Sequence, residues 1–181
     1  MANVIYSMTV SVDGFVTDRS GGLEWSVPDE ELFRFHLART KELAGHLQGR
    51  RLYEAMLVWE TDPAFRETEL EAEFADVWTA LPKVVLSRTL ERVEGSSRLA
   101  RASLEEELAA FDGDVGIGGA ELAAAAIERD LVDELHVFRY PIVLGGGTPY
   151  LPPLPEPLRL DRVGTTEFGS GVVLERYRRV R

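Results

Sequence analysis

Three short segments of this 181-residue chain carry the residue types that bind a phosphorylated ligand. In chain order they are Gly49-Arg50-Arg51-Leu52, Ser87-Arg88-Thr89 and Ile117-Gly118-Gly119-Ala120-Glu121-Leu122. Arginine forms forked, charge-assisted hydrogen bonds with a phosphate monoester, and a hydroxyl side chain adds another donor. A glycine turn that leads into a helix lets backbone N–H groups approach a phosphate, beside the positive end of the helix dipole. Together the three segments predict a site for a phosphorylated nucleotide.

Arg88 indicates which nucleotide the sequence favours. A ribose with a free 2′-hydroxyl calls for an acidic residue after a strand, whereas arginine in such a place suits a 2′-phosphate. The sequence therefore favours NADPH over NADH, and two charge-assisted hydrogen bonds predict a preference of about 100- to 10,000-fold. Two simpler explanations stay open. Glycine pairs also permit tight packing of a strand on a helix, and Arg50, Arg51 and Arg88 are equally compatible with ordinary exposed side chains.

The composition excludes several classes of function. The chain has 31 acidic and 20 basic residues and a formal charge of -11, which argues against binding to nucleic acid or to an anionic membrane. It has no cysteine, and its three histidines are His36, His46 and His136. They lack the spacing of metal ligands, so no metal site is expected. No apolar run is long enough to span a bilayer and the N-terminus lacks a secretory signal, so the cytoplasm is the expected location.

Strands and helices alternate along most of the chain. Apolar, β-branched or alternating segments predict strands at residues 3–12, 83–87, 115–118 and 132–143, followed by a hairpin of residues 159–168 and 172–180. Helices are predicted after Ser26, which is a possible N-cap, at residues 52–59 and 104–111, and after Gly119; residues 67–73 are interpreted as a solvated helix face. We therefore expect one α/β domain over residues 1–181, with a mainly parallel sheet, antiparallel C-terminal strands and helices on both faces. In such a sheet, ligands bind outside the carboxyl ends of the strands, where the three segments would open.

Five motifs, in order across nearly the whole chain, resemble the dihydrofolate reductase superfamily. They are Met8-Thr9-Val10-Ser11-Val12-Asp13-Gly14, Gly49-Arg50-Arg51-Leu52-Tyr53-Glu54, Val84-Val85-Leu86-Ser87-Arg88-Thr89, Gly116-Ile117-Gly118-Gly119 and Pro141-Ile142-Val143-Leu144-Gly145-Gly146-Gly147. The chain is most similar to the branch that contains the C-terminal reductase domain of riboflavin-biosynthesis enzymes and its stand-alone bacterial relatives. The resemblance implies a three-layer fold around an eight-stranded sheet, NADPH as hydride donor, a small-molecule substrate and a homodimer.

The resemblance also implies roles for individual residues. The 2′-phosphate of NADPH would lie near Arg50, Arg51, Ser87 and Arg88, and its pyrophosphate and nicotinamide would lie against the segment from Gly118 to Glu121. Trp25 and Pro28 resemble the segment that carries the substrate-binding carboxylate of dihydrofolate reductases. Glu30 would be its counterpart, with Asp29 as a substitute. Asp13 is a second candidate on the substrate side of the nicotinamide.

Two departures bear on the substrate. Leu81 stands where dihydrofolate reductases carry the arginine that holds the folate tail, and Phe138 stands where they carry a threonine paired to the catalytic carboxylate. The signature Gly145-Gly146-Gly147-Thr148-Pro149 belongs instead with the riboflavin branch, whose substrate is a pyrimidine with a phosphorylated ribosyl group. We therefore expect an enzyme similar to 5-amino-6-(5-phosphoribosylamino)uracil reductase, or one for a related pyrimidine or pterin. True dihydrofolate reductase activity and a non-catalytic nucleotide-binding module are the alternatives.

Overall fold

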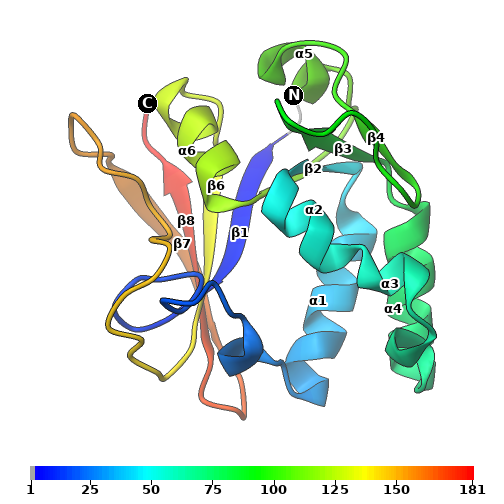
Figure 1. The fold of residues 1–181 in the computed structure, drawn as a ribbon. Coiled ribbons are helices and arrows are strands. Elements are labelled where there is room, and N and C mark those ends of the chain that lie inside the picture. Colours follow the sequence, from blue (N-terminus) through cyan, green and yellow to red (C-terminus); the bar gives the residue numbers. More distant parts are fainter. Residues whose placement is uncertain (1–2) are drawn as a thin grey trace.

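A computed structural model describes residues 3–181 and shows a single eight-stranded sheet with the strand order β4-β3-β2-β5-β1-β6-β8-β7. The six strands from β4 to β6 are parallel, and β8 and β7 continue the sheet in antiparallel pairing (Figure 1). The strands are β1 Val4–Val10, β2 Gly45–Gly49, β3 Lys83–Leu86, β4 Ser97–Leu99, β5 Val115–Gly118, β6 Glu134–Arg139, β7 Leu160–Glu167 and β8 Val173–Arg179. The predicted mainly parallel sheet with antiparallel C-terminal strands is confirmed.

The helices occupy the connections between the parallel strands. They are α1 Glu30–Glu42, α2 Arg50–Met56, α3 Val58–Thr61, α4 Glu69–Ala80, α5 Leu104–Ala109 and α6 Ala120–Glu128, with short 3-10 helices at Glu24–Ser26 and Pro63–Arg66. Thr68 and Ser103 start α4 and α5 with capping boxes, in which each hydroxyl and a glutamate three residues later bind each other's backbone N–H. These local signals explain why the acidic stretch before Phe74 is helical.

The two faces of the sheet are covered by different helices, as predicted. The register places Leu47, Val84 and Ile117 on one face, where α5 and α6 pack on them; we call this the α6 face. His46 lies on the opposite face, beside Trp78 of α4, and Phe138 lies there beside α1. We call this the α1 face. Among the described residues, no helix is both long enough and apolar enough to cross a membrane.

Five of the sequence-based assignments were wrong. Two strands were missed, because β2 has a single large apolar residue and β4 is only three residues long. The helix predicted for residues 52–59 starts at Arg50 and is divided into α2 and α3 at Leu57. The strand predicted for residues 132–143 ends at Arg139, before Pro141. Ser26 does not cap α1; it closes a 3-10 helix, and the Asp29 carboxylate accepts the Leu32 N–H instead.

Candidate functional site

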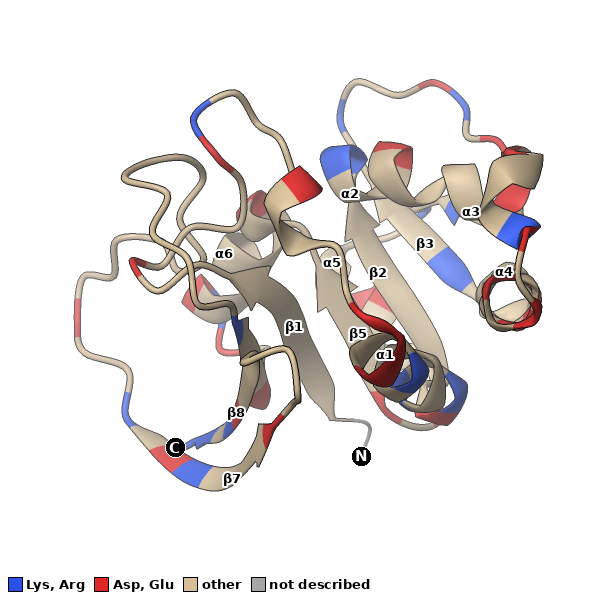
Figure 2. Ribbon diagram, turned by 90° about the horizontal axis from the view of Figure 1, so that it is seen from below, with Lys and Arg blue, Asp and Glu red and all other residues tan. Residues whose placement is uncertain are grey.

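The three segments singled out in the sequence meet at one edge of the sheet. Arg50 donates to the Thr89 hydroxyl at 3.1 Å, which links the turn after β2 to the turn after β3. Arg51 lies 3.6 Å from the Glu121 carboxylate, which links the start of α2 to the start of α6. A Cβ built on Gly119 would lie 3.4 Å from the Gly49 nitrogen, so the backbones of these two turns touch. Figure 2 shows basic residues at the start of α2 and mostly acidic ones on α4.

The turn after β3 is ordered by its own hydroxyl group. The Ser87 hydroxyl accepts the backbone N–H groups of Thr89 and Leu90 at 3.2 and 3.1 Å, which folds the chain back toward Arg50. Arg88 is exposed and forms no ion pair within residues 3–181. A free guanidinium beside ordered hydroxyl groups is a suitable arrangement for an incoming phosphate.

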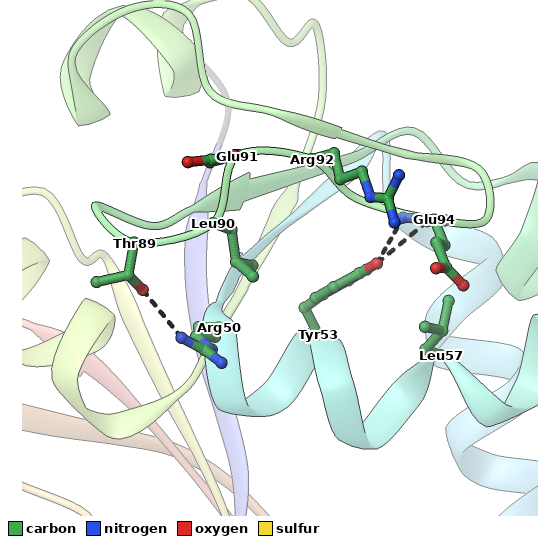
Figure 3. Close-up of a pocket in the computed structure, with 8 residues that line it drawn as sticks. All are labelled: Arg50, Tyr53, Leu57, Thr89, Leu90, Glu91, Arg92 and Glu94. Carbon is green, nitrogen blue, oxygen red and sulfur yellow. Dashed lines mark hydrogen bonds between the residues drawn. The ribbon is translucent and has the colours of Figure 1, made fainter.

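An open pocket of about 560 Å³ lies between α2 and the loop after β3 (Figure 3). Its lining combines two arginines, apolar side chains and carboxylates: Arg50, Tyr53, Leu57, Thr89, Leu90, Glu91, Arg92 and Glu94. The Tyr53 hydroxyl accepts the Glu94 N–H at 2.7 Å, so it holds the far end of the loop against α2. The pocket therefore has one wall on a helix and one on a hydrogen-bonded loop.

The glycines of the β5 segment serve different purposes. Gly119 has φ +96°, a conformation that other residues rarely adopt, and it lies at the N-cap of α6 without any side-chain cap. Its turn leaves the first backbone N–H groups of α6 free to meet an anion. Gly116 and Gly118 are needed for packing, because built Cβ atoms there would lie 2.5 Å from the His46 ring and 2.1 Å from Leu52. The packing explanation therefore holds for Gly118 and the turn explanation for Gly119.

Strands β1 and β5 separate at this edge. Their pairing ends at Tyr6 and Ile117, whereas β1 continues beside β6 as far as Val10. In this stretch Ser7, Met8 and Thr9 are only half-buried, although β1 lies in the middle of the sheet. The end of this pairing leaves the last residues of β1 without a neighbour on the β5 side, next to Gly119; we call this place the opening, and it is the switch point where ligands bind in folds of this type.

The candidate carboxylates are exposed or already have hydrogen-bond partners. Glu30 has a side chain that is 72% exposed and forms an ion pair with Arg34 at 2.7 Å. Asp29 is exposed and caps α1 through the Leu32 N–H. Trp25 packs edge-on against Tyr140 at a ring distance of 5.7 Å. The structure thus does not bring Glu30 or Asp29 together with the three turns, and their roles stay predictions.

Asp13 anchors a glycine loop. Its carboxylate accepts the backbone N–H groups of Leu144 and Gly145 at 3.0 and 2.7 Å. Partial desolvation acts to raise the pKa of Asp13, but hydrogen bonds from Ser11 and from these two amides lower it below the usual value. An ionised carboxylate with these partners is suited to holding the loop, and its catalytic role stays a prediction.

Phe138 is a core residue on the α1 face, 3% exposed, and its ring lies 4.5 Å from that of His36. Sequence patterns did not single out His36, His46 or Gln48 for the site, and all three lie on this side of the sheet. Burial lowers the pKa of His36 to about 4, and burial together with the charge of Lys83 does the same for His46. Both rings are neutral at pH 7. If β2 had been recognised as a strand, its alternation would have placed His46 and Gln48 on one buried face, and this would have marked both as candidates.

Comparisons with known proteins agree with this architecture. A family model for the RibD C-terminal domain matches residues 115–174. The uncharacterized protein YyaP of Bacillus subtilis (strain 168) is 27% identical over 177 residues, which cover 94% of this chain and 91% of that protein. The crystal structure of a putative riboflavin biosynthesis protein from Shewanella sp. PV-4 is 25% identical, with a TM-score of 0.77 and complete coverage of both chains.

A more distant neighbour has the same fold. The dihydrofolate reductase of Enterococcus faecalis, complexed with NADP(H) and RAB-propyl, superposes with a TM-score of 0.64 at 17% identity. The match covers 99% of this chain and 97% of the reductase.

Proposed function

We propose that the chain is a member of the RibD C-terminal branch of the dihydrofolate reductase-like superfamily and that it is an NADPH-dependent reductase. One observation carries the proposal. The turns that hold Arg50, Thr89 and Gly119 come from three distant parts of the sequence and contact one another at the carboxyl edge of the sheet. Folds of this kind place their ligands at that edge.

The residues present fit a dinucleotide with a 2′-phosphate. Arg50, Ser87, Arg88 and Thr89 offer guanidinium and hydroxyl donors at one end of the site. The backbone of the uncapped turn at Gly119 offers N–H donors at the other. Leu52 and Leu122, whose Cβ atoms approach the Gly119 and Gly49 positions, give apolar walls between them. When bound, NADPH would supply a hydride to an electrophilic carbon of the substrate.

For the substrate we propose a pyrimidine that carries a phosphorylated ribosyl group. The related Shewanella protein is described as a putative riboflavin biosynthesis protein, and the family model is that of the RibD C-terminal domain. Phe138 stands at the strand position where dihydrofolate reductases carry a threonine, and its side chain is a core aromatic ring. The hydroxyl partner that a folate-type carboxylate uses is therefore missing at this position. This observation favours the pyrimidine over folate.

The surroundings of the candidate carboxylates indicate where the proton that must accompany the hydride comes from. Glu30 faces solvent beside Arg34, and hydrogen bonds keep Asp13 ionised. We therefore propose that bound water delivers the proton, with the half-buried hydroxyl groups of Ser7 and Thr9 lining its route along β1.

We also propose a homodimer, which light scattering after size-exclusion chromatography tests directly.

Calorimetric titration with NADPH and NADH tests the proposal. We expect NADPH to bind at least about 100-fold more tightly, because only NADPH carries the 2′-phosphate. Arg88→Ala is expected to reduce the preference for NADPH over NADH at least tenfold. Arg162→Ala, which changes an exposed arginine on β7, is expected to leave this preference unchanged. Equal affinity for both cofactors, or no binding at high micromolar concentration, would contradict the proposal.

Steady-state oxidation of NADPH separates the three functional alternatives. Turnover with a ribosylaminopyrimidine phosphate supports the proposed reductase, and turnover with dihydrofolate alone would support dihydrofolate reductase activity. Tight binding of NADPH without turnover of either substrate would support a non-catalytic nucleotide-binding module.

A further inference from the structure

The side chain of Gln48 is buried without a hydrogen-bond partner at the edge of the proposed site. Gln48 is 1% exposed, and neither its amide nitrogen nor its amide oxygen has a partner within residues 3–181. Leaving a buried donor and a buried acceptor both unpaired is costly, and native proteins rarely do so away from a functional site. The group therefore needs an explanation that the folded chain alone does not give.

The other buried polar side chains of the strands provide a comparison. Lys83 and His136 lie on the same face of the sheet as Gln48. The Lys83 ammonium donates to the Ser96 hydroxyl at 2.7 Å and lies 3.3 Å from Glu60, and His136 lies 3.0 Å from Glu134. Gln48 alone of the three is unpaired. On β2 itself, the Nδ1 atom of His46 is also buried without a partner, so both polar residues of this strand carry an unpaired atom, and Gln48 is the residue whose two polar side-chain atoms are both buried and unpaired.

The position of Gln48 points to a ligand. It is the residue before Gly49, and its register partner on β5 is Gly118, the residue before Gly119. On the far side of β5, the next strand is β1, at the height where its pairing with β5 has ended and Ser7 is half-buried. The unpaired amide thus lies within the row of residues that borders the opening.

We propose that Gln48 is a specificity-determining residue that binds the amide edge of a ligand. A carboxamide presents a donor beside an acceptor, and its complement is another planar group with an acceptor beside a donor. The inference rests on the proposed function, which supplies two ligands with such an edge. These are the carboxamide of the nicotinamide ring and the lactam N–H and C=O of a pyrimidine.

Calorimetry with Gln48→Met tests the proposal, because methionine keeps the length of the side chain and removes both hydrogen-bonding atoms. The probes are NADP⁺, 2′-phospho-ADP-ribose, which lacks nicotinamide, and 5,6-diaminouracil in saturating NADP⁺. If the carboxamide is the partner, NADP⁺ binding weakens about tenfold and 2′-phospho-ADP-ribose binding does not change. If the lactam is the partner, only 5,6-diaminouracil weakens, by a similar factor.

The thermal stability of the ligand-free protein distinguishes this role from a structural one. Replacing an unpaired buried amide by an apolar group of similar shape is expected to keep or raise the melting temperature. Leu47→Met, on the same strand but facing the opposite side, is the control and is expected to leave all affinities unchanged. Unchanged affinities in Gln48→Met, with or without a lower melting temperature, would overturn the inference while leaving the proposed reductase intact. Failure of the wild-type protein to bind any probe would overturn both.

Discussion

The two faces of the sheet have opposite characters. On the α6 face, the buried strand residues Val84, Val115 and Ile117 pack against the small, apolar residues of α6 such as Ala123 and Ala126. Apart from the Tyr6 phenol, the buried polar side chains that the strands contribute within residues 3–181 all lie on the α1 face: Gln48, Lys83 and His136. The half-buried rings of His36 and His46 lie on the same side.

This difference shows how stability and chemistry are divided within one sheet. An apolar face stabilises the fold through burial alone, and its residues tolerate substitutions of similar volume. A face with buried polar groups is stable only where each group has a partner, so each unpaired atom marks a place where a ligand is expected. The α1 face also borders the opening between β1 and β5, which is consistent with that interpretation.

The largest effect is expected from Lys83→Met. The side chains of Lys83 and Glu60 are 1% and 5% exposed, and removing one partner leaves the other charge buried and uncompensated. We expect a loss of about 3–5 kcal/mol in the free energy of unfolding, measured by urea denaturation. Lys41→Met, which removes an exposed ion pair with Glu73, is the matched control and is expected to cost at most about 1 kcal/mol. Similar losses in the two variants would show that burial on this face carries no special cost.

Much of the fold was predictable because its signals are local. The glycine turn into α6 and the alternation in the C-terminal hairpin each identify an element without knowledge of its neighbours. Strand β2 was missed because a buried strand that carries His46 and Gln48 does not show an apolar run. Polar residues fit at these positions because the glycines of β5 leave room beside them, and only the folded structure shows that β5 is the neighbouring strand.

The site was predictable in part. Arginine, hydroxyl and glycine residues identified the three turns, because phosphate chemistry restricts the residue types that bind it. The candidate carboxylates were less predictable, since their direction depends on where α1 begins. With Asp29 as the N-cap, Glu30 is the first residue of the helix and faces solvent. A change of cap by a few residues turns a side chain to another side of a helix, and sequence patterns locate helix ends poorly.

A smaller effect is expected from Gly116→Ala. A Cβ at this position would lie 2.5 Å from the His46 ring and 3.1 Å from Leu43, so the packed imidazole must shift. We expect a loss of about 1–3 kcal/mol in the free energy of unfolding. If His46 is the cause, the loss should shrink in a His46→Ala background, which a double-mutant cycle measures. Independent, additive losses would show that the glycine is needed for another reason.

The smallest effect concerns pH. His36 and His46 have pKa values of about 4 in the folded protein, against about 6.5 in the unfolded chain, so below pH 6.5 the unfolded chain binds more protons. Stability is therefore retained above pH 6.5 and lost as the pH falls towards 4. Between pH 7 and pH 5.5 each histidine is expected to cost about 1 kcal/mol, measured by urea denaturation. His36→Phe combined with His46→Leu should reduce the slope in this interval to the part that His136 contributes, since burial lowers its pKa as well. The loss below pH 4.5 should remain, because there the unfolded chain protonates carboxylates such as Glu107, whose pKa in the folded protein is about 2. If the double variant keeps the full slope between pH 7 and pH 5.5, the neutral rings of the α1 face do not control its response to acid.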